Sequence, residues 1–245
     1  MIAVPFAATS GDRQLAEHIA QSAAVSCPGV DIQIAFLGDR DARLPVGQVG
    51  EPANGAAPTP RAVVVPLLAG SHPAIDAAIG TAVERASAPV MLAGHLGPHP
   101  LLAGALHDRL SDAGLARASR ARGISIAVGS SGVLLVADRG PQAVTDAGVT
   151  AVLLAARLAM PVAPASIDDP ASVHTALDRL REAGANHISI APCVIGPESD
   201  PAMFGRLSSA LGTPCAPPLG SHPAIAQLVA IRYGEALARI GVASR

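Results

Sequence analysis

The segment Leu-Gly-Pro-His-Pro at residues 96–100 returns, with one change, as Leu-Gly-Ser-His-Pro at residues 219–223. An arginine follows each segment at the same distance, Arg109 after the first and Arg232 after the second, so both features repeat at an offset of 123 residues. Internal repeats of this length indicate a duplicated structural unit, and such a unit decides the architecture of a chain.

Two further pairs of segments repeat in the same order. The Ala-Val-Val-Val-Pro-Leu-Leu-Ala-Gly of residues 62–70 matches the Ile-Ser-Ile-Ala-Pro-Cys-Val-Ile-Gly of residues 188–196, at an offset of 126. The Ile-Ala-Val of residues 2–4 returns at residues 126–128, at an offset of 124. Three pairs at nearly one offset favour duplication of a whole domain over repetition of a single motif.

The repeat predicts two duplicated halves, residues 1–115 and 124–245, that face each other across a cleft. Each half has the size of a typical small domain. Junctions between domains are favoured ligand sites. One chain would supply both walls of the cleft, so a monomer would be sufficient for a site.

The composition favours an α/β fold. The chain has 245 residues, of which 50% are hydrophobic but only 2% aromatic, so its core must consist of Ala, Val, Leu and Ile. Such cores are typical of parallel sheets that are buried on both faces. Short apolar runs alternate with amphipathic runs, which predicts βαβ units and a small, mostly parallel sheet flanked by helices in each half.

The expected strands and helices follow from these runs. The strands are predicted at 2–6, 30–37, 61–68, 88–93, 124–129, 160–165, 186–192 and 212–216. The helices are predicted at 12–26, 73–86, 99–113, 141–159, 170–183, 200–210 and 222–240.

Charge and motif content exclude several classes of function. The net charge is −2 and the basic residues form no long run, which argues against a nucleic-acid partner. The chain contains no Lys, Walker motif or Gly-x-Gly-x-x-Gly, so we expect no nucleotide cofactor. Cys27, Cys193 and Cys215 are widely spaced, and no apolar run is long enough to span a membrane. We therefore expect a cytoplasmic protein without a membrane partner.

The third predicted strand and the loop after it resemble the class II metallochelatases, which are the sirohydrochlorin cobalt and iron chelatases of cobalamin and sirohaem synthesis. The resemblance rests on Val-Val-Val-Pro-Leu-Leu at 63–68, followed by Gly70, His72 and Asp76. The Leu-Gly-Pro-His-Pro-Leu-Leu of residues 96–102 is similar to the next block of the family. The second half resembles the C-terminal repeat of the long, two-domain members, so the resemblance covers essentially the whole chain.

The resemblance implies an ATP-independent chelatase, which is a lyase, that inserts Co²⁺ or Fe²⁺ as a substrate into a sirohydrochlorin-type tetrapyrrole. The family's first strand normally ends in a His of the metal site, where this chain has Phe6. Its second strand is often followed by an acidic residue, where this chain has Gly38.

His72 is the expected metal ligand and proton acceptor, and hence the expected catalytic residue. It follows a predicted strand at its C-terminal end, where open α/β sheets bind ligands. Neutral imidazole suits first-row metals and takes up protons near neutral pH. His95 could supply a second metal ligand in place of the His that the first strand lacks. Asp76, four residues after His72, could orient the imidazole or favour the start of the helix through its dipole.

The second half contributes further candidates to the cleft. Glu198 occupies the repeat position of His72, and Ser130 lies near that of Phe6. The Gly-Ser-Ser-Gly of residues 129–132 could bind a carboxylate through backbone N–H groups.

Other polar residues have less specific interpretations. Arg13 and Arg40 are candidates for contacts with carboxylates of a macrocycle. His99 and His222 stand before a predicted helix in both halves, which favours a structural role such as capping.

Three function classes remain open from the sequence. The chain could be a chelatase, a catalytically degenerate paralogue that binds a tetrapyrrole or metal as carrier or regulator, or a small-molecule-binding protein unrelated to tetrapyrroles. Convergence of His72 with another His or an acidic side chain across the cleft would favour the chelatase. Phe6 filling the space beside an isolated His72 would favour the binding protein.

Overall fold

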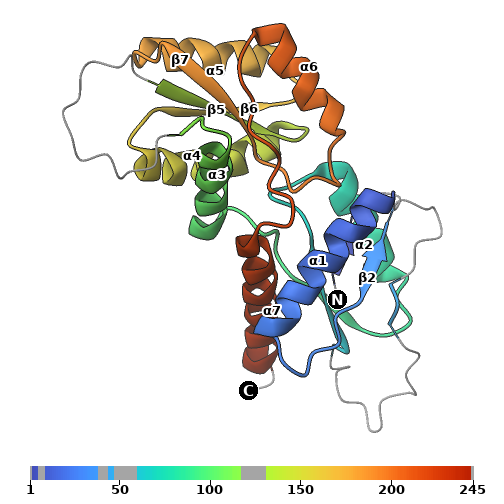
Figure 1. Cartoon of the computed structure of the whole chain (residues 1–245). Coiled ribbons are helices and arrows are strands. Elements are labelled where there is room, and N and C mark those ends of the chain that lie inside the picture. Colours follow the sequence, from blue (N-terminus) through green and yellow to red (C-terminus); the bar gives the residue numbers. More distant parts are fainter. Residues whose placement is uncertain (1, 5–8, 38–43, 47–59, 117–130, 244–245) are drawn as a thin grey trace, which may run out of the picture.

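The computed structural model describes residues 2–4, 9–37, 44–46, 60–116 and 131–243, which form a mixed α/β protein with two small parallel sheets (Figure 1). The predicted α/β class is therefore confirmed, and duplication of the halves stays a prediction. Among the described helices, none combines the length and the apolar character needed to cross a membrane.

The first sheet has four strands in the order β2-β1-β3-β4. They are β1 (Ile2–Val4), β2 (Ile34–Phe36), β3 (Ala62–Pro66) and β4 (Val90–Leu92). All pairs are parallel, with Ile2 opposite Ile34 on one side and Val65 on the other. Residues 63–66 of β3 are all buried, which explains why the sequence shows a continuous apolar run there.

The second sheet repeats this order with three strands. They are β5 (Ser131–Ala137), β6 (Val162–Ser166) and β7 (His187–Pro192), arranged as β6-β5-β7. Cys215 forms an isolated parallel bridge with Ile190 of β7, at the place that β4 takes beside β3. The predicted strand at 212–216 is thus reduced, among the described residues, to this bridge.

The described part of the chain contains seven helices. They are α1 (Ser10–Ser26), α2 (Pro73–Glu84), α3 (Pro100–Asp112), α4 (Pro141–Leu158), α5 (Pro170–Glu182), α6 (Pro201–Leu211) and α7 (Pro223–Ala243). Six of them begin with Pro, whose missing N–H would have no partner in the first helical turn. This signal is visible in the sequence, and every helix lies within three residues of its predicted bounds.

The start of the second sheet differs from the prediction. The strand predicted at 124–129 lies outside the described residues, and the loop predicted at 129–132 is wrong at Ser131 and Gly132, which belong to β5. A Cβ on Gly132 would lie 2.8 Å from the Cβ of Ala185 and 3.2 Å from the Cδ2 of Leu180. Gly132 is therefore needed for close packing of the strand, not for a carboxylate-binding loop.

This packing gives a stability prediction. Gly132→Ala is expected to lower the free energy of unfolding by about 1–3 kcal/mol, because the added methyl group overpacks the site. Gly80→Ala is the matched control in α2, where the new Cβ lies more than 4 Å from every atom outside the neighbouring helix backbone and the adjacent residues; it should raise stability by about 0.5–1 kcal/mol. Urea unfolding measures both, and equal effects of the two variants would contradict the packing argument.

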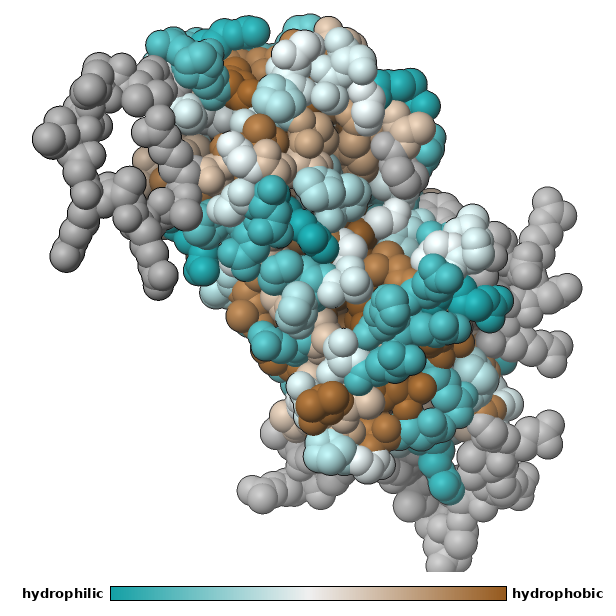
Figure 2. All heavy atoms as spheres, in the orientation of Figure 1, coloured by the Kyte–Doolittle hydropathy of each residue, from teal (hydrophilic) through white to brown (hydrophobic). Residues whose placement is uncertain are grey.

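Two helices cross between the sheets. α3 belongs to the first half of the sequence but packs against α4 and β7, whereas α7, the last helix, packs against α1, α3 and β3 (Figure 1). One apolar core accordingly joins the halves and includes Ile19, Leu67, Leu106, Leu154 and Leu228. The opposite face of α1 carries mainly hydrophilic residues, visible over the lower part of the molecule in Figure 2. The sequence boundaries 1–115 and 124–245 stay a prediction.

Candidate functional site

A small pocket lies where the ends of three strands meet. Its lining includes Ser71 and His72 after β3, Asp138 after β5, and Cys193 and Glu198 after β7. The C-terminal ends of parallel strands are the usual ligand position in open α/β sheets. The free space is about 20 Å³, which suits a water molecule or a metal ion but not a tetrapyrrole.

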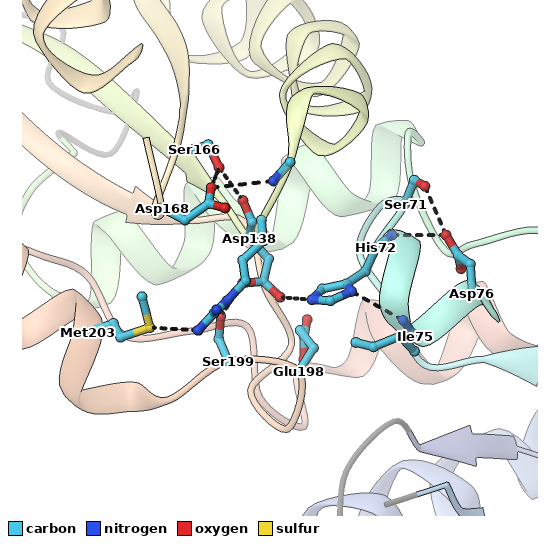
Figure 3. A network of polar contacts seen from close by, with 12 residues as sticks. Ser71, His72, Ile75, Asp76, Asp138, Ser166, Asp168, Glu198, Ser199 and Met203 are labelled. Atoms are coloured by element: carbon cyan, nitrogen blue, oxygen red, sulfur yellow. Dashed lines mark hydrogen bonds and ion pairs between the residues drawn. The ribbon is translucent and has the colours of Figure 1, made fainter. Parts of the chain in front are cut away.

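His72 is held at the N-terminus of α2. It is the N-cap residue, 7% exposed, and its Nδ1 accepts a hydrogen bond of 3.3 Å from the Ile75 N–H. Since Nδ1 acts as an acceptor, the proton of the neutral ring is on Nε2. The Nε2 atom faces the Asp138 carboxylate, with 3.4 Å to Oδ2 (Figure 3).

Asp138 comes directly after β5, so this pair joins the two halves of the sequence. Its Oδ1 accepts a hydrogen bond of 2.8 Å from the Ser199 hydroxyl, whereas its buried Oδ2 has no hydrogen-bond partner. Burial raises the pKa of the Asp138 carboxyl, and the Ser199 hydroxyl and the His72 ring oppose this rise in part. Oδ2 is therefore an available proton acceptor or metal ligand aimed into the pocket.

Glu198 is the second buried acid of the pocket, with an exposed fraction of 4%. Its carboxylate accepts hydrogen bonds from the backbone N–H groups of Ile195 and Gly196. These bonds favour the charged form, but burial has the larger effect and raises the pKa of Glu198 to about 7. Burial also raises the pKa of the Cys193 thiol to about 12, so this cysteine stays protonated at neutral pH.

Asp76 and His95 form a separate pair beside the pocket. The Asp76 Oδ1 lies 2.7 Å from the His95 Nε2, and its Oδ2 accepts bonds from the Ser71 hydroxyl at 2.9 Å and the His72 backbone N–H at 3.0 Å. Asp76 thus contacts the backbone of His72 and the ring of His95. The predicted contact of Asp76 with the His72 imidazole is not formed, because Nδ1 of that ring accepts from Ile75 and Nε2 faces Asp138.

Of the five other predicted residues, the structure describes only Arg13. Phe6, Ser130, Gly38 and Arg40 lie outside the described residues. The Arg13 guanidinium lies 5.4 Å from the centroid of the Phe36 ring.

The capping interpretation of the repeated histidines is confirmed. The His99 Nδ1 accepts from the Leu101 N–H at 3.1 Å, and the His222 Nδ1 accepts from the Ala224 N–H at 3.2 Å. Both rings therefore serve the first turn of a helix, α3 and α7 respectively.

Sequence reasoning missed Asp138. The available signal was the apolar run of residues 133–137, followed by Asp138 and then Gly140-Pro141 at a helix start. The first strand of the second half was predicted at 124–129, no element was predicted at 133–137, and the acid at the end of this run was not considered. The exposed Arg139 beside it adds a positive charge at this position.

The donor atoms of the pocket do not form a complete metal cage. Among the described residues, no group of three or more His, Cys, Asp or Glu side chains is placed to hold a metal ion. His72 can coordinate through Nε2 only if its ring proton moves to Nδ1, which gives up the bond from Ile75. A cation bound here would be held weakly.

Comparison of the sequence with protein families and with curated proteins finds no match. Two similar solved structures are SirB from Bacillus subtilis with Fe³⁺, at 16% identity and a TM-score of 0.64, and the sirohydrochlorin chelatase SirB from Bacillus subtilis subspecies spizizenii in complex with cobalt, at 15% and 0.60. The match covers 97% of this chain and 94% of each of those chains.

A multi-domain protein from Deinococcus radiodurans with structural similarity to chelatases is also similar, at 14% identity and a TM-score of 0.55; the match covers 95% of this chain and 54% of that one. The chain therefore has a class II chelatase-like fold, as the resemblance in the sequence predicted.

Proposed function

We propose that this chain is a chelatase that binds Co²⁺ or Fe²⁺ between its halves and inserts it into a sirohydrochlorin-type tetrapyrrole. The observation that carries the proposal is the approach of His72 Nε2 and Asp138 Oδ2 to 3.4 Å in a pocket that also contains Glu198. This is the convergence of a His and an acid that would favour a chelatase. The likeness to two SirB structures, with Fe³⁺ and with cobalt, supports it.

The pocket has groups for both tasks of metal insertion. The reaction releases two pyrrole N–H protons. Burial raises the pKa of both the Asp138 and the Glu198 carboxyl, which makes each a better proton acceptor, and the pKa of Glu198, at about 7, suits proton uptake near neutral pH. A metal that is to be transferred must also be released again. His72 can bind it only by giving up a helix-capping bond, which favours release.

The macrocycle would lie at the mouth of the pocket, because the pocket itself is too small for it. The exposed Arg139, next to Asp138, is suited to contact one of its carboxylates. The metal would then reach the ring from the inner side, where His72 and the two acids lie.

A second candidate function is binding without turnover, as a carrier or regulator. It is favoured by the absence, among the described side chains, of a complete set of three metal ligands. A small-molecule-binding role unrelated to tetrapyrroles has no specific support in the described part of the pocket.

Anaerobic spectrophotometry with sirohydrochlorin and Co²⁺, and then Fe²⁺, separates these candidates. A chelatase gives a protein-dependent shift of the Soret band, and His72→Ala should lower its rate by about 100-fold. Binding of the ring without insertion faster than in buffer would contradict catalysis and support the carrier. His187→Ala is a suitable control, because His187 is exposed at the opposite end of β7.

A further inference from the structure

The repeated arginines make reciprocal contacts between the halves. Arg109, on α3, donates from Nε at 3.1 Å and from Nη2 at 2.6 Å to the carbonyl oxygen of Leu219. Arg232, on α7, donates from Nε at 2.6 Å to the carbonyl of His95 and from Nη2 at 3.2 Å to that of Leu96. Each arginine thus binds the start of the Leu-Gly-x-His-Pro segment of the other half.

A series of polar contacts joins Arg232 to His72. The His95 carbonyl that Arg232 binds belongs to the residue whose ring contacts Asp76 at 2.7 Å. The other oxygen of Asp76 accepts from the Ser71 hydroxyl and from the His72 N–H (Figure 3). A chain of three polar contacts therefore joins the guanidinium on the last helix to the backbone of the proposed metal ligand.

A second series of hydrogen bonds and backbone links joins Arg109 to Glu198. Leu219, whose carbonyl Arg109 binds, precedes Gly220, and the Gly220 N–H donates to the Ile195 carbonyl at 2.8 Å. The Ile195 N–H in turn donates to the Glu198 carboxylate. The second half has Pro218 where the first has His95, so this path runs through the backbone and contains no imidazole.

We propose that Arg109 and Arg232 are positioning residues that couple the packing of α3 and α7 to the pocket. Arg232 sets the position of His72, and Arg109 sets that of Glu198. An arginine is suited to this role because its planar guanidinium donates in two directions and stays charged. The effect on metal binding rests on the proposed function, whereas the effect on the two loops does not.

Hydrogen exchange followed by mass spectrometry tests the two paths without any ligand. In Arg232→Gln, we expect exchange about 10-fold faster in peptides that contain residues 69–75, and no change at residues 194–199. Arg109→Gln should give the opposite pattern. Arg181→Gln, which removes an exposed ion pair with Asp178, is the control that should change neither segment. Equal acceleration of both segments in both variants would overturn the proposal.

A double-mutant cycle on Co²⁺ affinity distinguishes positioning from general stabilisation. Arg232→Gln and Asp76→Ala should each weaken binding of Co²⁺ by about 10-fold, and the double variant should bind no more weakly than the weaker single one. Arg232→Lys should recover part of the affinity, because it keeps one donor. Multiplied effects in the double variant would overturn the path through Asp76.

The two proposals can fail separately. If the wild-type protein binds no Co²⁺, the proposed function fails, and the exchange pattern alone then decides the role of the arginines. If Co²⁺ binds but the exchange changes are not specific to each variant, the positioning role fails and the proposed function stands.

Discussion

Asp138→Asn is expected to reduce the rate of metal insertion by about 100-fold or more, which is the scale of losing a positioned proton acceptor. Asparagine has the same size but carries no charge and cannot take up a pyrrole proton. The Asp138 Oδ2 is buried, has no hydrogen-bond partner and faces His72, so the carboxylate is available for this work. Stopped-flow absorbance of the Soret band would measure the rate.

The same variant should not lose stability at pH 8. Burial raises the pKa of Asp138, which means that its charged form is held in the folded protein at a cost. Removing the charge removes this cost, and only the polar contact with His72 is lost. Asp178→Asn, at an exposed carboxylate on α5, is the control that should leave the rate unchanged. Parallel loss of folding and activity in Asp138→Asn would show that Asp138 is structural.

Glu198→Gln should change the pH dependence of stability. Below pH 4.5 the carboxyl is protonated in both the folded and the unfolded protein. Between pH 4.5 and about 7 the folded protein binds more protons than the unfolded protein, so the free energy of unfolding falls as the pH rises. Above about pH 7 the carboxyl is ionised in both states, and the free energy of unfolding falls no further. The shift corresponds to roughly 3 kcal/mol at pH 8.

Glutamine stays neutral over this range, so the variant lacks this fall. At pH 4.5 the variant should be less stable than the wild type, because the glutamine NH₂ cannot accept the hydrogen bond that one of the two backbone N–H groups donates. Between pH 4.5 and pH 8, the difference in the free energy of unfolding between the variant and the wild type should shift by roughly 3 kcal/mol in favour of the variant. Urea unfolding at both pH values measures this. The exposed Glu182→Gln is the control, and a difference independent of pH would refute the burial argument.

The same ionisation should appear in activity. If Glu198 accepts a proton during insertion, the rate rises as the pH increases through about 7, since only the carboxylate can act as the acceptor. In Glu198→Gln this rise should be absent. A rate profile that is the same in both proteins would assign the proton transfer to another group.

The helices and most strands could be predicted because their signals are local. Proline at helix starts and buried apolar runs mark elements without knowledge of the rest of the fold. The place of His72 also followed from its position after a strand. The position of β5 was missed because the Ile-Ala-Val of residues 126–128 repeats that of residues 2–4 and drew the predicted strand to 124–129, whereas β5 takes the apolar run at 133–137.

Side-chain partners were harder to predict than elements. The spacing of four residues suggested that Asp76 contacts the His72 ring, but the capping role of that ring turns Nδ1 toward Ile75. The partner of Nε2, Asp138, lies 66 residues further along the chain and reaches it only through the packing of the halves. No local pattern contains this information.

The crossing of α3 and α7 has a consequence for the assembly of the molecule. Each half of the sequence carries a helix that covers the other half, so each fragment alone would expose the part of the shared apolar core that this helix covers. A chain cut between residues 116 and 131 should therefore stay together as a non-covalent complex. Two separately produced fragments should complement each other when mixed, in the manner of a split reporter protein.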